Sequence, residues 1–142
     1  MTPAEFEHRA KSVPFIVRGR SYDGWDCWGL VVRAYADVLG VELPTHDDAE
    51  YGVNDLRRIR KMMADGQALM PQWIASDTHR WGDVVLLRRG VVPCHVGVMV
   101  EPLTLLHTED RRGTFIEDVR RLGFLGYTVE GTYVHRGARY AR

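Results

Sequence analysis

Two short segments of this chain are the most informative for its fold and function: Asp26-Cys27-Trp28-Gly29-Leu30 and His95-Val96-Gly97-Val98. In the first stretch, Asp26 is a typical N-cap and places Cys27 at the start of a helix. In the second, His95 opens an apolar run typical of a buried strand. A thiol and an imidazole from distant parts of one small chain are the minimum for a cysteine nucleophile and its base.

The composition is that of a globular protein. The chain has 142 residues, of which 45% are hydrophobic and 27% are charged, so we expect a single domain over residues 1–142. Acidic and basic residues balance at 19 each, so the net charge attracts neither nucleic acid nor an anionic membrane. No stretch approaches the roughly 18 apolar residues of a membrane span. The charged N-terminus lacks the apolar segment of a signal peptide, which predicts a protein made in the cytoplasm without one.

The hydrophobic pattern that follows Cys27 predicts an amphipathic helix. Its apolar stripe consists of Trp28, Val31, Val32, Tyr35 and Leu39, and Gly40 is a typical stop signal. Other helices are expected over residues 4–11 and 55–64.

From Gly82 onward the hydrophobic period becomes that of strands. Strands are expected over residues 83–87, 95–101, 103–108, 114–119 and 126–135. Helices followed by a meander of strands predict an α+β domain, in which the N-terminal helices pack on a central antiparallel sheet of about five strands.

Cys27 has two possible roles. In the first turn of a helix, unpaired N–H groups and the helix dipole lower the pKa of a thiol, and the same N–H groups can hold a substrate oxyanion. Gly29 would let a backbone approach the sulfur, whereas the charge of Asp26 opposes ionisation unless its carboxylate turns away as a cap. The alternative is a small buried hydrophobic residue on an amphipathic helix.

His95 and His107 are the candidate partners of the thiol. On a strand, His95 shares a face with Gly97 and Met99, and we expect this face to meet the helix end that bears Cys27. His107 follows 12 residues later, across a tight turn, so antiparallel pairing makes it a neighbour that can orient the His95 ring. The alternatives are a core histidine at His95 and a surface histidine at His107, with Glu109 and Asp110 as rivals for the orienting role.

The other candidate ligands are interpreted as structural. Cys94 is expected to pack in the core, on the strand face opposite to His95. A zinc site built from the two cysteines with His95 and His107 is disfavoured, because the spacing contains no Cys-x-x-Cys or His-x-x-x-His pair. The remaining histidines are expected to be structural or exposed; they are His8, His46, His79 and His135.

Four segments together resemble the signatures of the NlpC/P60 family of cell-wall cysteine peptidases. Asp26-Cys27-Trp28-Gly29-Leu30-Val31 is similar to the family's Asp-Cys-Ser-Gly-Leu-Val. Trp81-Gly82-Asp83-Val84-Val85-Leu86 resembles its Pro-Gly-Asp-Leu-Val-Phe, His95-Val96-Gly97-Val98 its His-Val-Gly-Ile, and Leu105-Leu106-His107-Thr108 the strand with its third polar residue. Order and spacing agree over residues 14–108.

The resemblance implies a papain-like fold and hydrolysis of peptide stems of peptidoglycan, at bonds involving γ-D-glutamyl and diamino-acid residues. Cys27 would be the nucleophile, His95 the base and then the acid, and His107 the residue that orients His95. No metal or organic cofactor is implied. Asp26, Trp28 and Tyr22 are the candidates for oxyanion or substrate binding, with the core as the alternative for the Trp28 side chain.

The chain departs from the family pattern at Phe15. The family carries a tyrosine there whose hydroxyl helps to bind the oxyanion, and Tyr22 is the candidate substitute. The chain length and the tryptophan after the cysteine resemble a compact branch encoded in tail gene clusters of phages and gene transfer agents. This implies a tail-associated protein, with tail hub or tail-tip proteins as partners, that acts on the cell wall in the host periplasm.

Two other functions remain open. One is a related amidase or acyltransferase, which would use the same three residues on a different substrate. The other is a structural tail-tip or hub protein that has kept the fold and lost turnover.

Overall fold

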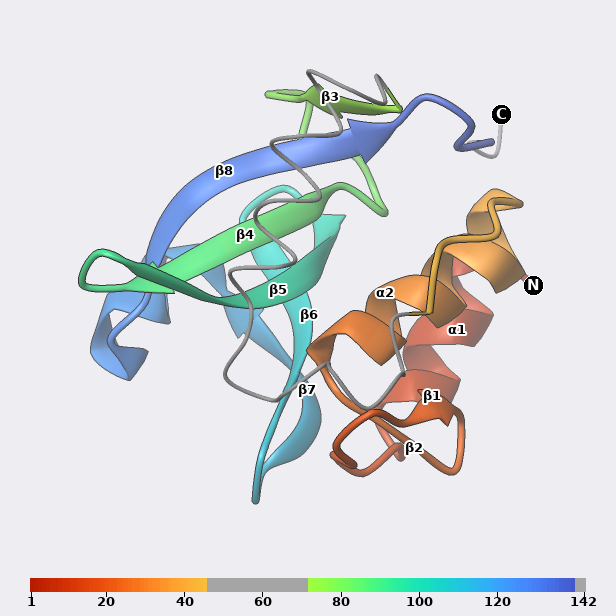
Figure 1. Ribbon diagram of the computed structural model, residues 1–142, viewed down its shortest axis with the longest axis horizontal. Coiled ribbons are helices and arrows are strands. Elements are labelled where there is room, and N and C mark those ends of the chain that lie inside the picture. Colours follow the sequence, from red (N-terminus) through yellow and green to blue (C-terminus); the bar gives the residue numbers. More distant parts are fainter. Residues whose placement is uncertain (46–71, 140–142) are drawn as a thin grey trace.

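The computed structural model describes residues 1–45 and 72–139. Helices α1 and α2 pack beside an antiparallel sheet (Figure 1), which confirms the expected α+β class. The helical elements are α1 (Pro3–Ala10), α2 (Cys27–Ala34), the π-helical turn η1 (Tyr35–Leu39) and the 3-10 helix η2 (Val119–Leu125). The strands are β1 (Arg20–Ser21), β2 (Gly24–Trp25), β3 (Trp73–Ala75), β4 (Val84–Arg89), β5 (Val92–Glu101), β6 (Thr104–Glu109), β7 (Gly113–Asp118) and β8 (Thr128–His135).

Helix α1 begins with a capping box. The hydroxyl of Thr2 accepts a hydrogen bond from the N–H of Glu5, and the Glu5 carboxylate accepts one from the N–H of Thr2, which satisfies two amides that a helix N-terminus leaves free. Phe6 lies on the buried face of α1 and stacks on Trp25, with ring centroids 5.9 Å apart. This contact holds the β1–β2 hairpin that leads into α2.

Helix α2 begins at Cys27, as the sequence predicts. All of its residues except Arg33 are buried, because the helix lies between the sheet on one side and α1 with the β1–β2 hairpin on the other (Figure 1). The chain continues as η1 and ends at Gly40, whose φ of 72° is the left-handed conformation typical of a helix C-terminus. No helix in the two described ranges is long and apolar enough to cross a membrane.

The larger sheet has six strands in the order β3-β8-β4-β5-β6-β7. Strands β4 to β7 form the expected meander, each within a few residues of its predicted bounds. Two details differ from the prediction. Strand β3 adds an edge strand, and β8 returns across the sheet to pair with β4 instead of continuing beside β7. The helix predicted over 55–64 lies outside the described residues.

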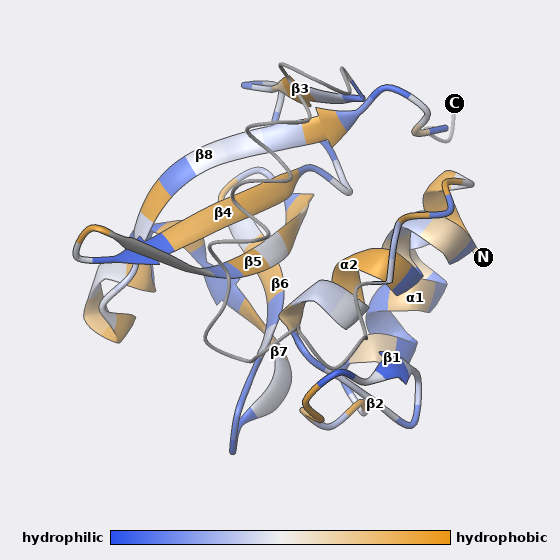
Figure 2. Cartoon of the chain, viewed as in Figure 1, coloured by the Kyte–Doolittle hydropathy of each residue, from blue (hydrophilic) through white to orange (hydrophobic). Residues whose placement is uncertain are grey.

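Two apolar clusters cover opposite faces of this sheet. Val96, Val98 and Val100 of β5 pack in the cluster that contains α1 and α2. Met99 belongs to the second cluster, whose buried members are Val85, Leu87, Met99, Leu105, Leu122 and Tyr127. Figure 2 shows β4 apolar along most of its length, as expected for a strand that is buried on both faces. Helix η2 and the residues after it close the face that α2 does not cover.

Gly29 lets the loop before β1 approach α2 closely. A Cβ atom at this position would lie 2.1 Å from the carbonyl oxygen of Gly19 and 2.8 Å from the Cβ of Trp25. Gly29 thus allows the close backbone approach that the sequence predicts, and the backbone that approaches is the protein's own loop before β1.

The variant Gly29→Ala tests this packing. Alanine normally stabilises a helix interior by about 0.5–1 kcal/mol relative to glycine, but here we expect a loss of at least about 1–3 kcal/mol from overpacking against backbone. Urea unfolding followed by circular dichroism measures the change. The matched control is Gly123→Ala in η2, where an added Cβ meets no atom within 4 Å. Equal unfolding midpoints for the two variants would contradict the packing.

Candidate functional site

Asp26 builds the N-terminus of α2. Its Oδ1 accepts a hydrogen bond of 2.9 Å from the N–H of Gly29 and forms an ion pair of 2.7 Å with the guanidinium of Arg20. Its Oδ2 accepts a hydrogen bond of 2.9 Å from the N–H of Arg18. Both carboxylate oxygens are thus engaged within the protein. Asp26 therefore serves as the N-cap that the sequence predicts.

The sulfur of Cys27 lies against strand β5. The backbone N–H groups of Val96 and Trp28 lie close enough to the sulfur to favour its thiolate form, and the residue is 7% exposed. Val96 directly follows His95 in the chain. The sulfur therefore contacts the peptide that joins His95 to Val96, which brings the predicted nucleophile to the strand that carries the predicted base.

The separation of β6 from β5 creates the place for this sulfur. Strands β5 and β6 are paired from Val98 and Leu106 to the turn that connects them. On the N-terminal side of Val98, β5 is not paired with β6. Odd-numbered amides of β5 face β4, as shown by the hydrogen bond of 2.8 Å from Met99 to Asp83. The Val96 amide consequently points toward β6, and the tip of α2 reaches it where β6 has moved away.

His95 and His107 form a buried pair. Nε2 of His95 and Nδ1 of His107 are 2.9 Å apart, which confirms the strand-neighbour prediction. His107 is fully buried and His95 is 6% exposed. The other ring nitrogen of His107, Nε2, is also buried and has no hydrogen-bond partner among the described residues. In His95, Nε2 contacts His107 and Nδ1 does not.

The histidine pair lies on the sheet face opposite to α2. The ring of His95 stacks on Tyr127, a member of the second apolar cluster, with centroids 5.1 Å apart and planes 15° apart. The expectation that this strand face meets the helix was therefore wrong, because Val96 and Val98 face α2 instead. A Cβ at Gly97 would collide with the Leu105 side chain at 2.8 Å, so Gly97 makes room for β6 and not for the helix.

Burial dominates the protonation of the thiol. The pKa of Cys27 rises to about 12, first because the sulfur is buried and next because Asp26 is near, while the N–H groups of Val96 and Trp28 act in the opposite direction. The prediction of a lowered thiol pKa was therefore wrong. The contribution of the helix N-terminus is present, but desolvation of the thiolate outweighs it.

Burial also keeps both imidazoles neutral. The pKa of His95 falls to about 3, because of burial first and then the proximity of His107 and Arg89. The pKa of His107 falls to about 4, because of burial and then the charge of Arg112. At neutral pH the closed site thus contains a thiol and two uncharged rings.

Two further candidates lie elsewhere. The Trp28 side chain is fully buried and donates a hydrogen bond of 2.9 Å to the carbonyl of Pro44, so it belongs to the core, and only its backbone N–H reaches the sulfur. The hydroxyl of Tyr22 donates to Asp37 in η1, roughly 15 Å along the helix from Cys27 at 1.5 Å per residue. The expectation that Tyr22 replaces the missing hydroxyl at Phe15 was wrong.

Tyr127 and Glu109 are the site residues that the sequence reasoning missed or left open. Tyr127 covers His95, and no motif signals it, because it reaches the site through the return of the chain after η2. The Oε1 atom of Glu109 lies 3.8 Å from Nδ1 of His107, beside the orienting histidine and not in its place. The side chain of Cys94 lies outside the described part of the structure.

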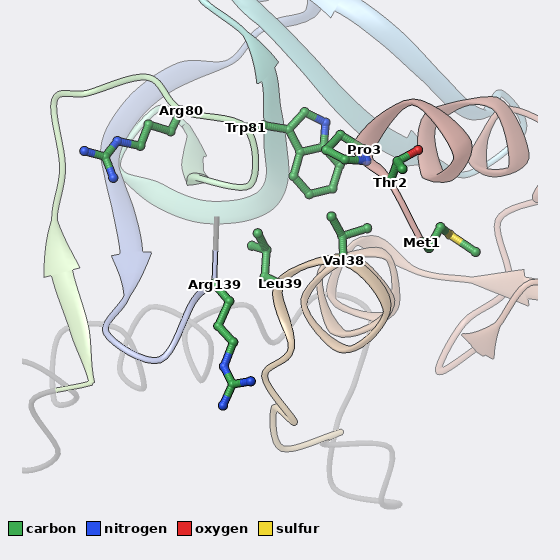
Figure 3. Close-up of a pocket in the computed structure, with 8 residues that line it drawn as sticks. All are labelled: Met1, Thr2, Pro3, Val38, Leu39, Arg80, Trp81 and Arg139. Carbon is green, nitrogen blue, oxygen red and sulfur yellow. The ribbon is translucent and has the colours of Figure 1, made fainter. Parts of the chain in front are cut away.

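Neither the groove described next nor any metal-binding cluster in the described residues offers a second candidate site for this chemistry. A groove of about 580 Å³ lies between the start of α1, the end of η1 and the turn at Trp81 (Figure 3). None of its lining residues is a candidate for the chemistry described above. Within the described ranges, no group of three histidine, cysteine or acidic side chains is placed to hold a metal ion.

Comparisons with known proteins identify the family and the fold. The family model described as "NlpC/P60 family" matches residues 12–132. The chain is 26% identical over 111 residues to "Murein DD-endopeptidase MepS/Murein LD-carboxypeptidase" of Escherichia coli (strain K12), a match that covers 77% of this chain and 49% of that protein. It is 27% identical over 114 residues to a "Probable endopeptidase" of Haemophilus influenzae, covering 78% and 59%. The chain thus spans about half the length of the curated relatives it matches.

Two solved structures share the fold. The NlpC/p60 domain of the peptidoglycan hydrolase SagA superposes with a TM-score of 0.57 at 15% identity, covering 94% of this chain and 98% of that one. A protein described as similar to lipoprotein, NLP/P60 family, from Staphylococcus aureus gives a TM-score of 0.59 at 17% identity, covering 99% and 41%.

The neutral histidine pair predicts that the protein loses stability in acid. An unfolded histidine titrates near 6.5, whereas the folded pKa values are about 3 for His95 and about 4 for His107. The unfolded chain therefore binds more protons below pH 6.5, so this stability is complete above that pH and is lost as the pH falls toward 4. Urea midpoints measured between pH 7.5 and 4.5 check the trend.

Two variants serve as controls for this trend. His107→Asn removes one titrating ring and should show a smaller loss of stability between pH 7.5 and 4.5 than the wild type. His79→Ala removes an exposed histidine outside the pair and should lose as much as the wild type. Parallel curves for the wild type and His107→Asn would rule out the neutral pair as the cause.

Proposed function

Because the chain belongs to the NlpC/P60 family, we propose that it is a cysteine peptidase that hydrolyses amide bonds in the peptide stems of bacterial peptidoglycan. The observation that carries this proposal is the contact of the Cys27 sulfur with the Val96 N–H, beside the His95–His107 hydrogen bond. The names of its relatives, murein endopeptidase and peptidoglycan hydrolase, support the same substrate class. The bonds proposed for cleavage involve γ-D-glutamyl and diamino-acid residues.

The proposed reaction is acyl transfer through the thiol. The sulfur of Cys27 attacks the amide carbonyl carbon while His95 takes the thiol proton on Nδ1. The C–N bond then breaks, and His95 returns this proton to the leaving amine. A water molecule, deprotonated by His95, hydrolyses the thioester and releases the acid. These steps need an uncharged His95 ring whose Nε2 donates a hydrogen bond to His107. Burial favours this uncharged form of the ring.

The first-turn amides of α2 are the proposed oxyanion donors. The Gly29 amide donates its hydrogen bond to the Asp26 carboxylate. The amides of Cys27 and Trp28, which precede Gly29 in the chain, are therefore the proposed donors to the oxyanion. The Trp28 amide already contacts the sulfur. Backbone donors held at a capped helix terminus are pre-organised for a charge that develops beside them.

Digestion of purified peptidoglycan with mass analysis of the fragments tests the catalytic roles. Cys27→Ala should abolish hydrolysis while the fold remains, and His95→Ala should reduce the rate by about 10³-fold or more, since the nucleophile and base act as a unit. His107→Ala should cost less, because it removes only the residue that orients His95. The control His79→Ala should retain the wild-type rate.

The fragments also separate the competing functions. Hydrolysis by Cys27→Ala at the wild-type rate would exclude the thiol as the nucleophile. Release of intact stems from the sugar, or transfer of the acyl group to an added amine, would indicate the amidase or acyltransferase. Undigested peptidoglycan with every variant would favour the structural tail protein. Slow alkylation of Cys27 in the free protein would not distinguish these functions, since burial alone raises the thiol pKa.

We further propose that the peptidase is a component of a phage-like tail or gene-transfer-agent tail, bound to hub or tail-tip proteins, and acts on the host cell wall from the periplasm. Its support is the length of the chain and the position of Trp28 directly after the cysteine. Mass spectrometry of gradient-purified particles and of the particle-free fraction checks this proposal. We expect the protein in the particle fraction, and its confinement to the particle-free fraction would overturn the tail assignment.

A further inference from the structure

The two histidines belong to a longer column of side chains on the face of the sheet that α2 does not cover. Tyr127 stacks on His95, and His107 lies against Phe115 with ring centroids 4.3 Å apart. Each end of the column is closed by a cation. The guanidinium of Arg89 lies 4.4 Å from the Tyr127 ring centroid, and that of Arg112 lies 4.1 Å from the Phe115 centroid.

We propose that Tyr127 and Phe115 are positioning residues that clamp the His95–His107 pair for proton transfer, with Arg89 and Arg112 as the outer ends of the clamp. This proposal rests on the proposed cysteine peptidase. It assigns no contact with substrate to either ring. Their contribution is to hold the two imidazoles in one relative orientation.

Tyr127 is the main element because of its geometry. Its ring is nearly parallel to that of His95, with 15° between the planes, so the imidazole can slide but cannot tilt without losing the stacking contact. Tyr127 is itself fixed by a hydrogen bond of 3.0 Å from its N–H to the carbonyl of Leu122, across the left-handed turn at Gly126. Helix η2 thus delivers the ring to the site.

Phe115 completes the clamp from the other side. It pairs with His107 in the β6–β7 register, so both side chains project from the same face of the sheet. The two rings lie at 53° to each other. His107 is consequently enclosed between His95 and Phe115, and the hydrogen bond that joins the two histidines is shielded from water.

The arginines act on the rings in two ways. Each contributes a cation–π contact to the outer face of an aromatic ring, and each disfavours protonation of the nearer histidine, so that Arg89 lowers the pKa of His95 and Arg112 that of His107. Oε1 of Glu109 lies 3.8 Å from Nδ1 of His107 and 4.0 Å from the guanidinium of Arg112. Burial raises the pKa of Cys27 on α2 to about 12, so its thiol adds no charge beside β5 at neutral pH.

The test compares Tyr127→Leu, which removes the ring, with Tyr127→Phe, which keeps it. In Tyr127→Leu we expect kcat on peptidoglycan fragments to fall by about tenfold or more with little change in KM, because a misplaced base costs rate more than binding. Tyr127→Phe should keep kcat within about twofold by the same argument. The matched control is Phe124→Leu, three residues earlier in the chain, where the side chain is 88% exposed.

A second readout needs no substrate. Proton NMR titration of the His95 ring should give a pKa that rises toward 6.5 in Tyr127→Leu, because water then reaches the ring. Arg89→Gln, on the exposed end of β4, should raise the same pKa by a smaller amount without threatening the fold, and Arg88→Gln is its control. These titrations hold even if the proposed activity fails.

Three results would overturn the clamp. The first is a wild-type kcat and an unchanged His95 titration in Tyr127→Leu. The second is an equal loss in Tyr127→Leu and Tyr127→Phe, which would assign the effect to the hydroxyl and not to the ring. The third result applies if Tyr127→Leu does not fold: the pKa of His95 is then the same in Arg89→Gln as in the control Arg88→Gln. If the wild type does not hydrolyse peptidoglycan but the pKa of His95 shifts in the variants as expected, the peptidase proposal is contradicted and the clamp is not.

Discussion

The approach of the Val96 amide to the Cys27 sulfur is the contact on which the geometry of the site depends. A buried strand amide must find an acceptor, and β6 does not supply one because it separates from β5 beyond Val98. The tip of α2 supplies the sulfur instead. Since side chains alternate along a strand, a slip of β5 by one residue would move His95 to the other face and present a different amide to α2. The contact therefore requires both this helix position and this strand register.

Burial decides how such a site must work. The contact between helix tip and sheet removes the sulfur and both imidazoles from water, which favours the uncharged form of all three groups. A resting thiolate–imidazolium pair is therefore disfavoured, although the helix terminus and the Val96 amide favour the thiolate. In the proposed reaction, proton transfer from Cys27 to His95 would then have to accompany attack on the carbonyl. The orientation of His95 consequently matters more than it would for a preformed ion pair, and that orientation depends on His107 and Tyr127.

The parts of this arrangement that were predictable from sequence are those with local causes. The cap at Asp26 and the stop at Gly40 set the bounds of α2 and η1, and the 12-residue spacing across a tight turn makes His95 and His107 neighbours. The return of β8 to β4 depends on long-range pairing, so Tyr127 could not be assigned to the site. The protonation of Cys27 could not be predicted either, because it depends on burial and not on helix position alone.

Phe15 bears on the proposed oxyanion site because it stands where the family pattern has a tyrosine. It forms an isolated bridge with Trp25, beside the hairpin that leads to Cys27, and it has no hydroxyl to offer an oxyanion. Tyr22 cannot replace it, because its hydroxyl is bound to Asp37 at the other end of the helix. The loss of one such donor costs about 10²–10³-fold in rate. The remaining proposed donors are backbone amides at the helix end that the capping and ion-paired Asp26 holds, so in the proposed reaction the stabilisation of charge would depend on the rigidity of that end.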